Sequence, residues 1–198
     1  MKSYVTLPEG YRQILSIDLQ KDKKLALLVN GLAVVISVVM VAIALCVVPW
    51  STLYEGDGGL FGFSLKMLAI ALGSVAYMVL HEAVHGIVMR RVCEAKVRFG
   101  FTGLYAFAGS DGYYCRTHYI IIALAPIVVW GIVLGVLNVL VPRDWFYVVY
   151  LVQVMNISGA AGDLYVSWKM SRLPADILVR DTGVAMTVFS RERGNDGT

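Results

Sequence analysis

The chain has 198 residues, of which 58% are hydrophobic and 16% are charged. The apolar share is higher, and the charged share lower, than in ordinary soluble domains, so the composition predicts a protein embedded in a lipid bilayer. The net charge of +3 comes without a basic face interleaved with stacking aromatic residues, which argues against a nucleic-acid partner.

The first 24 residues are more polar than residues 25–49, and we expect a cytoplasmic N-terminal segment there. Their stretch YRQILSIDLQKDKK fits either an amphipathic segment on the membrane surface or a plain polar lead-in. The next run, residues 25–49, carries no charge and exceeds the roughly 20 residues that cross a bilayer. It is too long for the core of a signal peptide and lacks a small-residue cleavage site, which predicts a retained span.

Three further apolar runs occur, at residues 66–89, 119–141 and 145–167. Each is long enough to cross the hydrocarbon core as a helix, and a chain in lipid must satisfy its own backbone hydrogen bonds. The sequence therefore predicts an all-α integral membrane domain over residues 25–170, with four transmembrane helices.

Lysine and arginine are distributed unevenly around these four spans. Of the 17 such residues, all but Lys66 and Arg143 lie before the first span, between the second and third, or at and beyond the end of the fourth. Positively charged loops mark the cytoplasmic side. We therefore expect a multi-pass protein of the cell membrane with both termini cytoplasmic, residues 171–198 forming a C-terminal tail and the turn-rich residues 51–64 lying outside.

Two segments outside the spans have strand patterns. Between the second and third spans, VRFGFTGLYAF and YYCRTHY flank AGSDG, which predicts a small cytoplasmic-side β-hairpin turning at residues 108–112. In the tail, ILVRDTGVAMTVF predicts a short hairpin that turns at Asp181-Thr182-Gly183. The same tripeptide occurs in aspartic proteases, but a lone copy within a hairpin pattern favours a turn.

Ionisable residues inside a membrane are costly and mark candidate functional sites. Within the four apolar runs the only acidic residues are Glu82 and Asp163, and two of the three histidines, His81 and His85, lie there as well. His81 to His85 spell H-E-x-x-H, which on a helix places both imidazoles on one face to bind Zn²⁺, with Glu82 as the catalytic base beside the activated water. The alternative, two core histidines bonded across helices, leaves Glu82 unexplained.

A catalytic zinc site needs a third protein ligand. The metzincin continuation is excluded, because Val88 and Arg91 stand where it requires Gly and His. Glu94 lies in a charged loop just past the helix, whereas Asp163 lies near the cytoplasmic end of the fourth run, at the depth of the histidines. Asp163 is therefore the predicted third ligand, and an ion pair with Lys169 is the alternative.

Asn156 precedes Asp163 by two helical turns, on nearly the same face, so its amide is a candidate substrate-binding group. The three cysteines have no paired spacing and are expected to be free thiols: Cys46, Cys93 and Cys115. His118 is expected at the surface or near the site.

Four stretches resemble a bacterial family of zincin peptidases, a membrane domain of unknown function: HEAVHG, NISGAAGD, ALAP and LPEGYRQILSIDLQKDKK. That family is similar in turn to the site-two intramembrane metalloproteases. The resemblance implies His81, His85 and Asp163 as zinc ligands, Glu82 as base and Asn156 as a substrate-positioning group. This chain departs from the site-two pattern, because it has Gly-Asp-Leu in place of Leu-Asp-Gly and no proline between Asn156 and Asp163.

The motif and the resemblance together predict a zinc-dependent peptidase that cleaves a peptide or membrane-protein substrate in or near the membrane, close to its cytoplasmic face. The alternative is a non-catalytic metal-binding membrane protein, acting as a sensor, a transporter or a protease-like scaffold. A transporter needs polar residues along a complete path. The first span and the outer halves of the others offer almost none.

Overall fold

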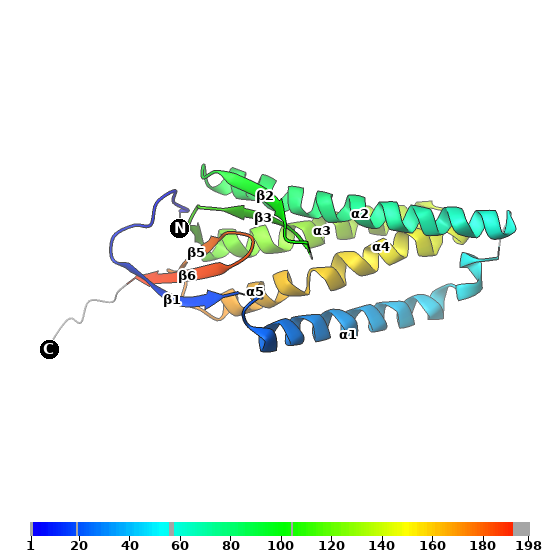
Figure 1. Cartoon of the computed structure of the whole chain (residues 1–198), viewed down its shortest axis with the longest axis horizontal. Coiled ribbons are helices and arrows are strands. Elements are labelled where there is room, and N and C mark those ends of the chain that lie inside the picture. The colour runs from blue at the N-terminus through cyan, green and yellow to red at the C-terminus, as the bar shows by residue number, and fades with distance from the viewer. Residues whose placement is uncertain (1, 19, 56–57, 104, 192–198) are drawn as a thin grey trace. The chain divides into compact units, whose positions relative to one another are not determined.

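The computed structural model describes residues 2–18, 20–55, 58–103 and 105–191. The described elements are mostly helices, with two small antiparallel sheets of four and two strands (Figure 1). The chain divides into two compact units. The helical unit comprises Leu27–His81 and Pro126–Gly162, and the sheet unit comprises Met1–Ala26, Glu82–Ala125 and Asp163–Thr198.

Three helices are long and apolar enough to cross a membrane: α1 (Lys23–Val47), α2 (Gly59–Val92) and α3 (Arg116–Leu140). Most of their length belongs to the helical unit. Large apolar side chains on α1 are not covered by other parts of the protein. The exposed fraction is 76% for Leu27 and 62% for Val38. Such a surface suits contact with lipid, because lipid-facing helices need no polar outer face.

The predicted fourth span is two helices. The short turn η2 (Arg143–Trp145) leads into α4 (Phe146–Gly159), and α5 (Ala161–Ser171) begins after a break at Ala160, whose φ is −86° and ψ is 17°. The run Gly-Ala-Ala-Gly surrounds the break and includes two glycines, which disfavour a continuous helix. Within the described part of the chain, three helices rather than four therefore reach membrane-spanning length.

The predicted outside loop is also shorter than expected. A short turn, η1 (Trp50–Leu53), is followed by α2, which begins at Gly59 rather than at residue 66. Lys66 is consequently a buried helical residue. Its Nζ donates to the Thr52 carbonyl at 3.1 Å and lies 3.7 Å from an Asp144 carboxylate oxygen, so the buried charge is paired.

The four-stranded sheet lies in the sheet unit and has the order β1-β6-β5-β4. Its strands are β1 (Tyr11–Ile17), β4 (Tyr114–Cys115), β5 (Leu178–Asp181) and β6 (Met186–Arg191). The N-terminal segment thus contributes a strand to this sheet. This N-terminal strand was not predicted, and it joins the strands of the C-terminal tail in one sheet. The fold is therefore mostly helical with small sheets rather than all-α.

The second sheet is a hairpin of β2 (Val97–Phe101) and β3 (Ala106–Ser110). The chain turns between Thr102 and Tyr105, where Gly103 has a φ of +90° and the Thr102 N–H donates to the Tyr105 carbonyl at 3.0 Å. The predicted turn at residues 108–112 is therefore wrong in position, because most of it belongs to β3. In the tail hairpin, β5 and β6 turn between Asp181 and Met186.

Buried residues from the end of α2, the start of α3, α5 and the four-stranded sheet form one core in the sheet unit. Its most buried members, each 0–2% exposed, are Met89, Tyr114, Ile122, Met170, Ile177, Val179 and Val188. This core packs the last turns of α2 and the later part of α5 against the four-stranded sheet, so the elements of the sheet unit support one another.

Candidate metal centre

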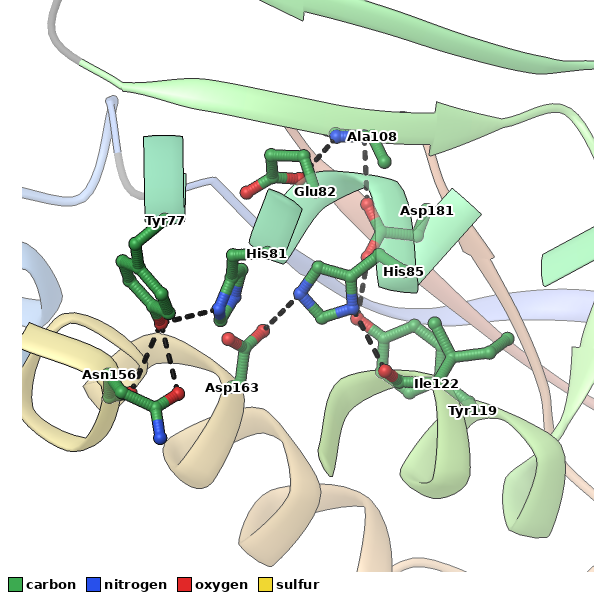
Figure 2. A network of polar contacts seen from close by, with 11 residues as sticks. Tyr77, His81, Glu82, His85, Ala108, Tyr119, Ile122, Asn156, Asp163 and Asp181 are labelled. Atoms are coloured by element: carbon green, nitrogen blue, oxygen red, sulfur yellow. Dashed lines mark hydrogen bonds and ion pairs between the residues drawn. The ribbon is translucent and has the colours of Figure 1, made fainter. Parts of the chain in front are cut away.

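His81 and His85 lie one turn apart on α2, as H-E-x-x-H requires (Figure 2). Each is only 8% exposed. A buried imidazole needs a hydrogen-bond partner for its N–H, and that partner decides which ring nitrogen remains for a metal.

In the helical unit, His81 belongs to a hydrogen-bonded chain with Tyr77 and Asn156. The Tyr77 hydroxyl lies 2.7 Å from His81 Nδ1 and 3.1 Å from Asn156 Oδ1. The amide oxygen can only accept, so it takes the single hydroxyl proton, and Nδ1–H of His81 donates to the tyrosine oxygen. This arrangement leaves Nε2 of His81 as the nitrogen with a lone pair for a metal.

In the sheet unit, His85 is oriented in the same way by a backbone carbonyl. Its Nδ1 lies 2.9 Å from the carbonyl oxygen of Ile122 on α3. A carbonyl can only accept, so Nδ1 carries the proton and Nε2 faces the site. Nε2 lies 3.6 Å from Oδ1 of Asp163.

Asp163 stands in the first turn of α5, where the positive end of the helix dipole favours a carboxylate. One ligand atom each from His81, His85 and Asp163 lies within 4.8 Å of the others. Two imidazole nitrogens and one carboxylate oxygen are the donors of a catalytic zinc site with an open fourth position. The three side chains therefore fit Zn²⁺, both by donor chemistry and by the tautomers that their partners impose.

Glu82 is held by the β-hairpin. Its Oε2 accepts the backbone N–H of Ala108 on β3 at 2.6 Å (Figure 2). The hairpin approaches α2 closely at Gly86, where an added Cβ would lie 2.3 Å from the Phe99 ring. The final glycine of HEAVHG thus lets β2 pack on the helix, and the adjacent strand fixes the direction of the Glu82 carboxylate.

Asn156 is fully buried. Besides its bond with Tyr77, its amide nitrogen donates to the Ile127 carbonyl at 3.3 Å and to Gln153 Oε1 at 3.4 Å. These partners give the amide a role in positioning His81 through Tyr77. Contact with substrate stays a prediction.

The other sequence candidates lie elsewhere. Glu94 is exposed past the end of α2 and is not a member of the metal-binding group. His118 Nδ1 lies 2.8 Å from the Ser3 hydroxyl. Cys46, Cys93 and Cys115 are present as thiols rather than as disulfides, as predicted. Asp181 closes the tail turn by accepting the Gly183 N–H at 2.8 Å, and burial raises the pKa of its carboxyl above the ordinary value.

Tyr77 is the residue that sequence reasoning missed. A signal was present, because Tyr77, His81 and His85 occur at intervals of four and so share one face of the helix. A tyrosine in an apolar helix is ordinary by composition, however, and only its buried contact with Asn156 shows its use.

Residues 74–178 match a protein family described as "Putative zincin peptidase". The matched segment includes all three metal-binding candidates, Glu82, Tyr77 and the β-hairpin. No curated protein and no solved structure matches the chain.

Proposed function

Because the chain belongs to the "putative zincin peptidase" family, we propose that it is a zinc-dependent peptidase that cleaves peptide bonds within or beside the membrane. One observation carries the proposal. Ligand atoms of His81, His85 and Asp163 lie within 4.8 Å of one another, next to a glutamate that the hairpin orients.

When bound, zinc would supply a Lewis acid that polarises a carbonyl and lowers the pKa of water. Nε2 of His81, Nε2 of His85 and the carboxylate of Asp163 would hold it. Glu82 would take the proton of the attacking water and deliver it to the leaving amine. The Ala108 N–H would keep the Glu82 carboxylate aimed during both transfers, since a hydrogen bond at Oε2 restricts rotation of the group.

The membrane setting of the reaction rests on α2. This helix is long and apolar enough to span a bilayer, and the two histidines lie in its second half. The loop after α2 is rich in lysine and arginine, which supports a site near the cytoplasmic face, with both termini on that side. The site-two proteases hold zinc with two motif histidines and an aspartate from a later part of the chain, and because the same donors meet here we propose them as mechanistic relatives.

The test combines metal analysis with a search for substrates. Purified Glu82→Gln protein should keep stoichiometric zinc, because Glu82 is not a ligand, yet cells carrying it should accumulate membrane peptides that the native protein removes. Asp163→Ala should lose both zinc and cleavage. Glu94→Gln is the matched control, since it changes an exposed glutamate in the same unit and should alter neither readout.

Each outcome is decisive. Zinc-loaded Glu82→Gln protein with undiminished cleavage would refute the catalytic role. Stoichiometric zinc in the native protein, with identical proteomes for native and Glu82→Gln cells, would favour a metal sensor or a protease-like scaffold. Zinc flux into vesicles that contain the native protein would favour a transporter.

A further inference from the structure

The sheet unit contains a pocket of about 660 Å³, and none of its lining residues belongs to the H-E-x-x-H motif. The end of β1, the residues that lead into α1 and one face of α5 line it. Its charged lining residues are Lys21, Lys23, Lys24, Lys169, Asp18 and Asp22. Four lysines against two aspartates leave an excess of positive charge.

Both aspartates are committed to the local backbone. Asp22 accepts the N–H groups of Lys24 and Leu25 at 3.1 and 3.0 Å, as the N-cap of α1. Asp18 accepts the Lys21 N–H at 3.2 Å and pairs with Lys21 Nζ at 3.3 Å. Their charges therefore serve the turn that starts the helix, and they offset only part of the positive charge in the pocket.

Three lysines remain to face an occupant. Within the residues that the structure describes, no ion pair of Lys23, Lys24 or Lys169 is found. Lys169 and Tyr165 lie one turn apart on α5 and both line the pocket. The site is thus basic, with a hydroxyl and an aromatic ring on one wall.

The pocket also lies where a membrane surface would be. Lys23 is the first residue of α1, a helix long and apolar enough to cross the bilayer. The start of such a helix lies at the depth of lipid headgroups. Apolar residues complete the lining, among them Leu15, Ile17 and Leu25. The lysines would therefore contact a lipid phosphate and the apolar residues its acyl chain.

We propose that this pocket binds the phosphate of an anionic phospholipid from the leaflet in which α1 begins. Basic pockets at span ends recognise such headgroups by charge. A lipid is favoured over free phosphate because the pocket combines lysines with apolar walls at the start of a span. The occupant would contact α5, whose first turn carries Asp163, and would stabilise that helix whether or not the protein is a peptidase.

The test uses the full-length protein in uncharged detergent, with thermal unfolding and lipid titration as readouts. Phosphatidylglycerol should raise the unfolding midpoint, and phosphatidylcholine or inorganic phosphate should not. The triple variant Lys23→Gln, Lys24→Gln, Lys169→Gln should bind phosphatidylglycerol roughly a hundredfold more weakly, as expected for the loss of three lysines at a membrane surface.

Its matched control removes three exposed positive charges of the same unit outside the pocket: Arg90→Gln, Arg91→Gln, Lys96→Gln. This control should bind like the native protein, and the single change Lys169→Gln should weaken binding several-fold even if the triple variant folds poorly. Equal stabilisation by phosphatidylcholine, full stabilisation by inorganic phosphate alone, or an equal loss in the control would each overturn the proposal.

Discussion

Replacing Tyr77 with phenylalanine removes one oxygen atom and keeps the ring. The ring packs in a buried cluster with Leu134 and Val152 and makes an edge contact with His81, with 5.5 Å between the ring centres. Packing should therefore survive the change. The substitution removes the acceptor for His81 Nδ1–H at 2.7 Å and the donor to Asn156 Oδ1 at 3.1 Å.

The magnitude is set by these two bonds. Removing the partner that orients a metal-binding histidine typically weakens metal affinity by about 10- to 100-fold, or about 1.4 to 2.7 kcal/mol. Two buried polar groups also lose their partner, which costs about 1–3 kcal/mol of folding stability for each group left unsatisfied. Tyr77→Phe should thus bind zinc more weakly and unfold more readily without zinc.

A chelator competition titration on detergent-purified protein measures the zinc Kd. Tyr150→Phe is the control, because that part-buried hydroxyl donates to the Met40 carbonyl at 2.8 Å within the helical unit and has no part in the metal centre. It should lose about 1 kcal/mol of stability and keep its zinc Kd. A native zinc Kd in Tyr77→Phe would refute the claim that the hydroxyl fixes the tautomer of His81.

Two further predictions concern the sheet unit. Gly109→Ala should lower the free energy of unfolding by roughly 1–3 kcal/mol, because the new Cβ would lie 2.1 Å from the Thr182 carbonyl oxygen. The control Gly31→Ala adds a Cβ that meets nothing within 4 Å and should not lower it. Thermal unfolding of the two variants measures the difference. The hydrogen bond from Arg180 lowers the pKa of Asp111 below its ordinary value of 3.8. A carboxyl whose pKa is lower in the folded than in the unfolded protein stabilises the fold at pH values above its unfolded pKa, and this stabilisation is lost as the pH falls through its folded pKa. The difference in unfolding free energy between the native protein and Asp111→Asn should therefore shrink below about pH 4. A difference that stays constant with pH would contradict this.

The turn of the β-hairpin illustrates where local patterns mislead. AGSDG has the composition of a turn, yet its first three residues belong to β3. Gly109 is needed there because the strand runs against the Thr182 backbone, and Asp111 pairs with Arg98 and Arg180 from β2 and β5. These glycine and aspartate requirements come from residues distant in the chain, so the local pattern alone could not distinguish a turn from a packed strand.

The fourth apolar run shows a similar limit. Its composition is apolar enough to suggest one span, but α4 ends at Gly159 and α5 starts at Ala161. The break puts Asp163 in the first turn of a new helix, where its side chain meets His85. Hydropathy averages over such a break, because it counts side chains and takes no account of backbone direction.

The sequence by itself determined that the chain has apolar segments long enough to cross a membrane, and that one of them carries two histidines and a glutamate on neighbouring positions. It could do so because composition and helix periodicity are local properties. It also predicted Asp163 as their partner, and the structure brings the three ligand atoms within 4.8 Å. Only the tertiary structure decided which groups orient them. Tyr77 lies one turn from His81 on α2, but its hydroxyl is bonded to Asn156 of α4. The Ile122 carbonyl and the Ala108 N–H come from α3 and β3. Only packing in three dimensions sets these contacts, because their partners lie far apart in the chain.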